Sequence, residues 1–301
     1  MIKVIFLLLL GLSSTLLPAQ ELHRLDFGSV AETQSFFSYH NRDSVGPIIS
    51  GHRGGAVQKY PENSIEALEH TLRATPAVFE IDVRLTNDGR AVLLHDASLD
   101  RTTTGSGKIR DHSLKELRNL RRKNPQGKLT DVGILTLEQA IQWAKGRTLI
   151  NLDVKDVPGE MKVALVKKFN AFPYVIFTVH SPEEARAFLE QDPRSMFSAF
   201  IKTPEAFRAY EDAGIPWENI LMAYVGPWSK PENRELYDLL HEKGVRVMVS
   251  AASSYDKLED PEARAEAYRK IIEEGADILE TDRPIEAAAA IAPYLNQNIN
   301  N

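Results

Sequence analysis

The sequence predicts an α/β fold, a TIM (β/α)8 barrel with a small insertion after the second strand. Short β-branched or apolar runs alternate with amphipathic helical runs, and this alternation occurs eight times over about 245 residues. Strands that alternate with helices pair in parallel, and eight such units close a barrel. An open doubly wound sheet is the alternative, but it usually has fewer strands. No Gly-x-Gly-x-x-Gly turn follows the first strand.

The elements follow a lead segment, residues 20–46, which has no long periodic pattern and is expected to be extended. We expect the eight barrel strands at Ile48–Ser50, Val78–Val83, Thr148–Val154, Tyr174–Val179, Met196–Ile201, Ile220–Val225, Val245–Val249 and Ala276–Glu280. Helical periodicity predicts the covering helices at Ser64–Arg73, Leu137–Ala144, Glu160–Phe169, Pro182–Glu190, Pro204–Ala213, Arg234–Lys243, Pro261–Glu274 and Ile285–Ile291. No repeat or Pro/Gly-rich linker divides this region, so residues 47–301 are predicted to be one catalytic domain.

The insertion lies between the second and third barrel strands. It contains a short strand, Ala91–Leu94, a stretch rich in Thr, Gly and Ser, and a basic helix predicted over residues 113–123. Loops that follow barrel strands gather at the C-terminal face, where the substrates of such barrels bind. The basic run is therefore a candidate anion-binding surface, although such runs are more often a solvated helix face. Its members are Arg118, Arg121, Arg122 and Lys123.

The first nineteen residues have the pattern of a signal peptide. Lys3 precedes the apolar run Val4–Leu10, and Ala19 is a small residue at a plausible cleavage point. This predicts export to the periplasm or out of the cell, with no stable membrane anchor after cleavage. An uncleaved anchor is the alternative, but a membrane-spanning helix needs roughly 20 apolar residues, and Gly11–Ser14 interrupt this run.

The composition excludes several kinds of chemistry. The chain has no cysteine, so it has no disulfide, no lipid-carrying cysteine, no zinc thiolate and no cysteine nucleophile. The 36 Lys and Arg residues against 42 Asp and Glu give a formal charge of −6, which argues against a nucleic-acid partner. Any metal must be bound by oxygen or imidazole, which favours Mg²⁺ or Ca²⁺.

Charged residues follow the first barrel strand and alternate within the second. His52 and Arg53 come directly after the first strand, and an arginine fork matches phosphate oxygens. Glu80 and Asp82 are two residues apart, so both side chains point to one face of their strand. Two carboxylates at a barrel mouth repel each other unless a cation lies between them. We interpret them as a metal site; a salt bridge to Arg84 or Arg53 is the alternative.

Two further strand ends carry reactive groups. His95 follows the short strand of the insertion, and with His52 it forms a pair suited to acid–base work because their ordinary pKa is near 6.5. Asp153 and Lys155 alternate at the end of the third barrel strand, so they share a face. They offer a third carboxylate and a second cation.

Together, these motifs resemble the glycerophosphodiester phosphodiesterase (GDPD) family. The resemblance is carried by His52-Arg53-Gly54, Pro61-Glu62-Asn63-Ser64, Glu80-Ile81-Asp82-Val83, Thr86-Asn87-Asp88-Gly89, His95-Asp96, Leu99-Asp100-Arg101-Thr102-Thr103, Asp153-x-Lys155, Gly275-Ala276-Asp277 and Thr281-Asp282-Arg283-Pro284. It covers nearly the whole mature chain and is densest before Thr104. The set is highly specific, although no single motif is.

The resemblance implies a barrel hydrolase that cleaves a glycerophosphodiester to glycerol 3-phosphate and an alcohol. It implies a role for each candidate residue: His52 and His95 as the acid–base pair, Glu80, Asp82 and Asp153 as ligands of one divalent cation, Mg²⁺ or Ca²⁺, and Arg53 and Lys155 as phosphate ligands. Whether water or the glycerol 2-hydroxyl is the nucleophile is left open.

Two positions depart from the family pattern. Asp153 stands where the family commonly has Glu, which shortens the reach of the third carboxylate by one methylene. Residues 247–250 read Val-Met-Val-Ser, where the family often has a Trp-Thr pair. The second departure concerns the pocket for the alcohol and leaves the chemistry unchanged.

Two other functions are weighed against this one. A lysophospholipase D or sphingomyelinase D-like enzyme, which forms a cyclic phosphate, would need an exposed apolar lip, and residues 94–136 contain no such run. A catalytically silent phospho-ligand-binding barrel would not need the two histidines. The expected partner is thus a small glycerophosphodiester.

Several remaining residues have simpler interpretations. Asn63 is expected to fix a turn, and Ser64 to cap the following helix. His180 and Tyr224 are candidates for the pocket lining, and Trp228 for headgroup contact. The other histidines are predicted to be surface groups: His23, His40, His70, His112 and His241.

Overall fold

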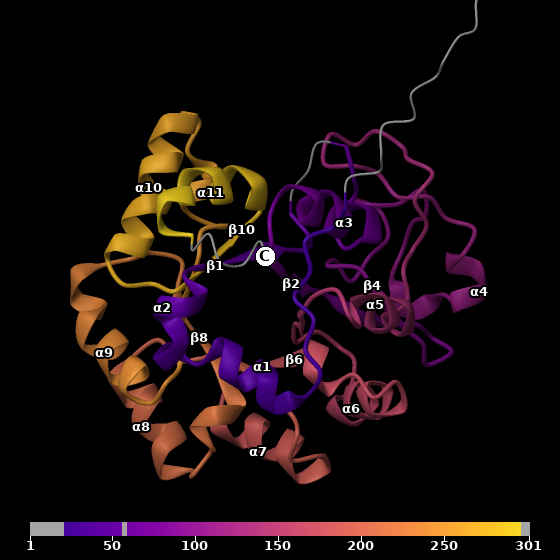
Figure 1. Ribbon diagram of the computed structural model, residues 1–301. Helices are drawn as coiled ribbons and strands as arrows, with labels where there is room; N and C mark the ends of the chain where they lie inside the picture. The colour runs from indigo at the N-terminus through magenta and orange to yellow at the C-terminus, as the bar shows by residue number, and fades with distance from the viewer. Residues whose placement is uncertain (1–20, 56–58, 296–301) are drawn as a thin grey trace, which may run out of the picture.

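The computed structural model describes residues 21–55 and 59–295, and its centre is a closed barrel of parallel strands (Figure 1). The strand order is β1-β10-β9-β8-β7-β6-β5-β2, and β2 pairs with β1 to close it. The strands are β1 (Ile48–His52), β2 (Val78–Ile81), β5 (Ile150–Leu152), β6 (Val175–Val179), β7 (Phe197–Phe200), β8 (Ile220–Gly226), β9 (Arg246–Ser250) and β10 (Ile278–Thr281). The predicted TIM barrel is confirmed.

Helices surround the barrel, one after each strand or insertion (Figure 1). They are α3 (Ile65–Ala74), α5 (Leu137–Ala144), α6 (Gly159–Lys168), α7 (Pro182–Gln191), α8 (Pro204–Asp212), α9 (Arg234–Glu242), α10 (Pro261–Glu273) and α11 (Pro284–Ala290). These bounds agree with the periodicity to within one residue because the ends are chemically marked. The hydroxyls of Ser64, Ser181 and Thr203, for example, each accept a backbone N–H at the start of a helix.

The insertion forms a small layer beside the barrel rather than a long basic helix. Its strands β3 (Val83–Leu85) and β4 (Ala91–Leu93) pair antiparallel, so the expected second strand divides at Asp82. Apolar side chains pack beneath them in a separate cluster: Val92, Leu94, Leu99, Ile109, Leu114, Leu117 and Ile134. This satellite core holds the loop that carries His95.

The basic helix predicted over residues 113–123 is wrong. Only α4 (Leu114–Leu117) is helical within this stretch. The chain then becomes extended, and Arg122 forms an antiparallel β-bridge with Thr103. Arg122 is fully buried and donates to the carbonyl oxygens of Asn63 and Leu93 at 3.1 and 3.4 Å. Burial lowers its pKa to about 10, so it stays charged at neutral pH. It ties the insertion to the turn before α3.

The lead segment is helical from Val30 to Val45, which corrects the expected extended form over that stretch. It contains α1 (Val30–Phe37) and α2 (Arg42–Val45), which lie across one end of the barrel in Figure 1. Arg246, at the start of β9, is fully buried and donates to the carbonyl oxygens of Phe37 and Gly46 at 3.0 and 2.9 Å. These helices therefore cover the amino ends of the strands. Each spans only one or two turns, which is too short to produce a clear periodic signal in the sequence.

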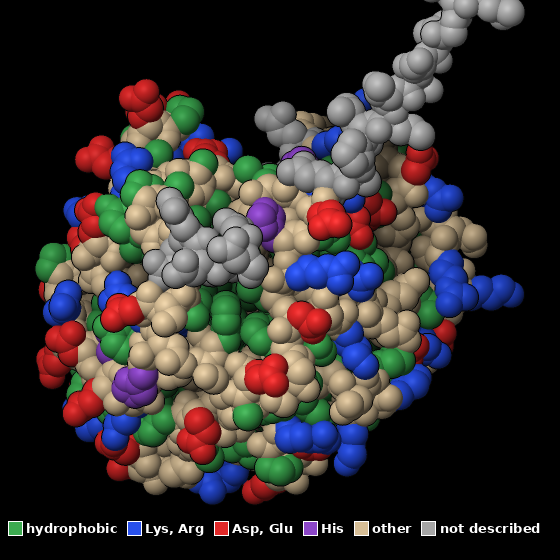
Figure 2. All heavy atoms as spheres, in the orientation of Figure 1, with side chains coloured by type: hydrophobic (Ala, Val, Ile, Leu, Met, Phe, Trp, Pro, Cys, Tyr) green, Lys and Arg blue, Asp and Glu red, His purple; other side chains and the backbone are tan. Residues whose placement is uncertain are grey.

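His241 is also held at this end, although it was predicted to be a surface group. Its Nε2 lies 2.7 Å from the Asp277 carboxylate, and its ring stacks on Tyr39 at a centroid distance of 3.6 Å. Figure 2 shows acidic and basic side chains interspersed around this face, without a continuous basic surface. Within residues 21–55 and 59–295, no helix is long and apolar enough to cross a membrane. The predicted signal peptide, residues 1–19, lies outside the described residues.

Candidate active site

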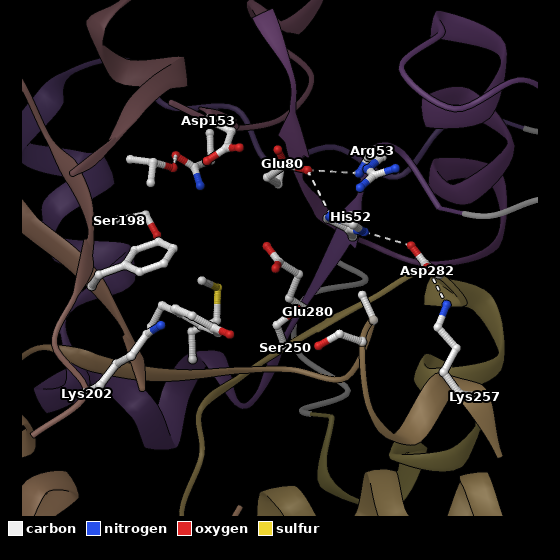
Figure 3. A pocket seen from close by; sticks show the side chains of 17 residues that line it. His52, Arg53, Glu80, Asp153, Ser198, Lys202, Ser250, Lys257, Glu280 and Asp282 are labelled. Atoms are coloured by element: carbon white, nitrogen blue, oxygen red, sulfur yellow. Dashed lines mark hydrogen bonds and ion pairs between the residues drawn. The ribbon is translucent and has the colours of Figure 1, made fainter. Parts of the chain in front are cut away.

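A cavity of about 510 Å³ opens at the carboxyl ends of the barrel strands (Figure 3). Every barrel strand contributes a side chain to its lining, because alternate residues near the strand ends point inward. The register explains this convergence: His52 lies beside Glu80, and Glu280 lies between Ser50 and Ser250. Charged side chains at the ends of β1, β2, β5, β7 and β10 thus face a single volume.

His52 is held between two carboxylates. Its Nδ1 lies 2.7 Å from Asp282 Oδ1, and its Nε2 lies 3.8 Å from Glu80 Oε2. Figure 3 shows both interactions. Burial opposes the charged imidazolium, but the Asp282 hydrogen bond and the charges of Glu80 and Glu280 together raise the pKa of His52 to about 9. Asp282 therefore fixes the imidazole ring through Nδ1, and Nε2 is the nitrogen directed toward Glu80.

The three predicted metal ligands come together. Glu80, Asp82 and Asp153 each place a carboxylate oxygen within 4.8 Å of the others. Burial and the neighbouring Asp82 charge raise the pKa of Glu80 well above its ordinary value. Glu80 and Asp153 line the cavity, whereas Asp82 is buried just behind the lining.

This donor set fits a divalent cation. Oxygen ligands crowded at one point carry mutual repulsion that a hard cation such as Mg²⁺ or Ca²⁺ removes. Asp82 is also oriented for the purpose, because Asn63 Nδ2 donates to its carboxylate at 2.8 Å and its own N–H donates back to Asn63 Oδ1 at 3.0 Å. Asn63 thus does more than shape the turn expected from its sequence context.

The two predicted phosphate ligands flank the acidic cluster. Lys155 Nζ lies 2.6 Å from Asp153 and 3.1 Å from Asp82. Arg53 Nε lies 3.5 Å from Asp82, so the salt bridge weighed as an alternative to a metal site is also present. Arg53 has a φ of 55°, a left-handed backbone conformation that is rare outside glycine. That conformation lets its own N–H donate to Glu80 Oε2 at 3.2 Å.

His95 lies at the edge of this group and is not part of the cavity lining. The N–H of Leu94 donates to the carbonyl of Asp82 at 3.2 Å, which places the loop beside the acidic cluster. His95 Nδ1 lies 2.8 Å from Asp96. Arg101 bridges Asp96 and Glu62, and its hydrogen bond lowers the pKa of the Asp96 carboxyl strongly.

Three groups of site residues are not found by sequence reasoning. Asp282 lies in the Thr281-Asp282-Arg283-Pro284 motif, but its partner His52 is 230 residues away. Glu280 alternates with Asp282 at the same strand end and lines the cavity. Phe200 and Lys202 likewise alternate at the end of β7, a period-2 signal that the sequence does contain.

Of the other residues that the sequence suggested for the pocket, some line the cavity and others lie outside it. Tyr224 lines the cavity, as does Met248 in the stretch where the family pattern differs. His180 is exposed and packs edge-on against Phe200 with centroids 4.3 Å apart, outside the lining. Trp228 is also outside it and packs against Tyr255.

Comparison with known proteins identifies the family. The sequence model of the glycerophosphoryl diester phosphodiesterase family matches residues 52–203, half of the chain. A crystal structure of a glycerophosphoryl diester phosphodiesterase from Parabacteroides distasonis is 52% identical, with a TM-score of 0.89, over 92% of this chain and 96% of that chain. This chain belongs to the glycerophosphoryl diester phosphodiesterase family.

More distant members support the same placement over part of the chain. Glycerophosphodiester phosphodiesterase from Caldanaerobacter subterraneus is 31% identical over 44% of this chain and 57% of its own length. Glycerophosphodiester phosphodiesterase 1 from Mus musculus is 33% identical over 44% of this chain and 40% of its own length. The match thus spans about half the length of these curated relatives.

Proposed function

We propose that this protein hydrolyses glycerophosphodiesters to glycerol 3-phosphate and an alcohol. The observation that carries the proposal is the placement of His52, fixed by Asp282, within 3.8 Å of a carboxylate that belongs to a three-carboxylate cluster. A binding protein needs an anion site, but it does not need an oriented imidazole beside such a cluster. The family relatives named above, which carry this activity in their names, support it.

In this proposal each side chain has a distinct task. Glu80, Asp82 and Asp153 would hold one divalent cation, which when bound withdraws charge from the phosphoryl oxygens. Arg53 and Lys155 would bind the non-bridging oxygens and stabilise the charge that gathers there. One histidine would remove the proton of the nucleophile and the other would donate a proton to the leaving alkoxide. Asp282 and Asp96 would keep the two rings oriented through Nδ1.

The alternative of a lysophospholipase D or sphingomyelinase D-like enzyme, which would need an exposed apolar lip, receives no support from the described surface. Its large exposed hydrophobic side chains are Leu129, in the insertion, and Trp228 and Leu258, of which Trp228 packs against Tyr255. Three side chains of this size offer little apolar surface for an intact lipid. We therefore propose deacylated, water-soluble diesters as substrates and, with the leader sequence, a site of action outside the cytoplasm.

The direct test is turnover by the purified protein. Glycerophosphodiesters with different alcohols should be cleaved, the chelated protein should be inactive, and added Mg²⁺ or Ca²⁺ should restore activity. Phosphorus NMR distinguishes direct hydrolysis to glycerol 3-phosphate from a route that passes through a cyclic phosphate. Full activity after exhaustive chelation would contradict the metal assignment, and absence of turnover across the panel would favour a binding protein.

A further inference from the structure

One wall of the cavity carries an aromatic pair with a lysine over it. Phe200 and Lys202 come from the end of β7, and Tyr224 comes from the neighbouring strand β8. All three line the cavity. In Figure 3, Lys202 lies across the cavity from Arg53 and Glu80, which belong to the phosphate end of the proposed site. This wall is therefore placed to meet a part of the substrate other than its phosphoryl group.

The lysine occupies the face that the two rings present. Lys202 Nζ lies 4.8 Å from the centroid of Phe200 and 4.8 Å from that of Tyr224. The ring centroids are 4.6 Å apart, with planes inclined by 59°. Within residues 21–55 and 59–295, no carboxylate lies within ion-pair distance of this ammonium. The two other lysines near the cavity differ, since Lys155 pairs with Asp153 and Lys257 with Asp282.

This arrangement has a consequence for the alcohol arm of a substrate. Paired aromatic faces bind quaternary ammonium groups well, through cation–π attraction. Here the ammonium of the chain itself takes that place, so a trimethylammonium arm must displace Lys202 or lie against a like charge. An arm with a phosphate or several hydroxyls instead gains an N–H donor that no carboxylate among the described residues competes for.

We propose that Lys202, seated on Phe200 and Tyr224, makes the enzyme prefer diesters whose alcohol arm is anionic or polyhydroxylated over those whose arm is a quaternary ammonium. The inference rests on the proposed function, because it concerns the substrate class of that site. Glu280 acts in the opposite direction, since its carboxyl points into the same cavity and attracts cations. The Lys202 variants test whether the lysine outweighs Glu280 in this choice.

The experiment measures kcat/KM for three diesters that share the glycerophosphoryl group. Their alcohols are choline, glycerol, and glycerol bearing a terminal phosphate monoester, all assayed at one free Mg²⁺ concentration. The wild-type protein should cleave the phosphate-bearing diester best and the choline diester worst. Lys202→Ala should lower kcat/KM for the phosphate-bearing diester about tenfold, the value of one charge-assisted hydrogen bond. It should also raise kcat/KM for the choline diester about threefold, because the rings become accessible.

Two variants control for loss of structure. Lys202→Arg keeps the charge over the rings and should keep the wild-type order of substrates. Lys243→Ala removes another lysine over an aromatic ring, since Lys243 Nζ lies 5.9 Å from the Trp217 centroid and pairs with Glu211. Neither Lys243 nor Trp217 lines the cavity, so this variant should leave the preference unchanged.

The outcomes separate this inference from the function on which it rests. An opposite change for the choline and phosphate-bearing diesters supports the role of Lys202, because a purely structural defect lowers both. An equal fall for all three diesters, or a wild-type preference for choline that Lys202→Ala does not alter, overturns the inference and leaves the phosphodiesterase activity intact. Failure of the wild-type protein to cleave any of the three overturns the proposed function, and this inference with it.

Discussion

The two histidines proposed as an acid–base pair are held in place by different parts of the molecule. His52 lies inside the barrel mouth, and its partner Asp282 comes from the opposite end of the chain. His95 lies on the insertion, outside the cavity lining, and its partner is the adjacent residue Asp96. His52 is thus positioned by closure of the barrel between β1 and β10, whereas His95 is positioned by one loop.

That difference affects how well each ring resists disturbance. The β1–β10 contact belongs to the barrel itself, so moving His52 would disturb a parallel strand pair. We call His52 with Asp282 the His52 arm, and His95 with Asp96 and Arg101 the His95 arm. The His95 arm depends on Arg101, whose side chain is 49% exposed and links Asp96 to Glu62. Exposed ion pairs contribute little individually and are screened by salt. We therefore expect the two arms to differ in their sensitivity to substitution.

The largest expected effect is the loss of either imidazole. His52→Ala and His95→Ala should each lower kcat about 10²- to 10⁴-fold, the usual contribution of an acid–base group. Both variants should retain the circular dichroism spectrum and thermal unfolding of the wild-type protein. Full activity in either folded variant would remove that histidine from the mechanism. A small loss for His95→Ala alone would instead show that His95 is not an acid–base group and that the proton transfers depend on residues within the cavity.

The next effect concerns the carboxylate that orients His52. Asp282→Asn keeps the size of the side chain and removes its charge, so the hydrogen bond at 2.7 Å becomes a neutral one. A hydrogen bond to a charged group contributes about 1.5–3 kcal/mol, which corresponds to roughly 10- to 150-fold in rate. We expect the loss in kcat, with KM little changed, because Asp282 acts on the ring and not on the phosphoryl group.

Steady-state kinetics checks this assignment of Asp282. Asp282→Glu should recover part of the rate if the longer side chain still reaches Nδ1. A rise in KM with an unchanged kcat would show that Asp282 serves substrate binding instead.

The contrast between the two arms also explains what the sequence could predict. His52, Glu80 and Asp153 are predictable because parallel strands bring their carboxyl ends together, and each residue follows a recognisable apolar run. The predicted barrel also places the last strand beside the first, but no local pattern shows that Asp282, just beyond that last strand, reaches His52 Nδ1. The helices are predicted well because periodicity and capping are both local signals in the sequence.

The remaining errors come from residues whose usual preference is overridden. Arg122 is predicted on a helix face because arginine is rarely buried, yet it donates to two backbone carbonyls, those of Leu93 in the insertion and Asn63 in the turn before α3. His241 is predicted at the surface, although an Asp277 carboxylate and the ring of Tyr39 enclose it. Such partners come from distant elements, so only the three-dimensional structure reveals them.

A smaller effect is expected on the exposed side of the His95 arm. Arg101→Ala removes the bridge between Asp96 and Glu62 but leaves the Asp96 hydrogen bond to His95. We expect kcat to fall about two- to fivefold, as for solvent-screened ion pairs, with KM unchanged. The deficit should be smaller at high ionic strength, because salt already weakens the bridge in the wild-type protein.

A matched variant tests whether this loss is specific to the bridge. Arg118→Ala removes an exposed arginine from the same insertion and should leave kcat unaltered. Equal losses in the two variants would indicate that general surface charge, rather than the Asp96–Glu62 bridge, is responsible.

The smallest expected effect is on the exposed side of the His52 arm. Lys257 Nζ lies 3.6 Å from Asp282 Oδ2, and the lysine side chain is 66% exposed, so this pair resembles the Arg101 bridge in its exposure to solvent. Asp282, however, is also bound to His52 within the barrel, and its position does not depend on the lysine. Lys257→Ala should therefore change kcat less than about twofold. Steady-state kinetics on the glycerol diester measures it beside Arg101→Ala, and a larger loss for Lys257→Ala would reverse the ranking of the two arms.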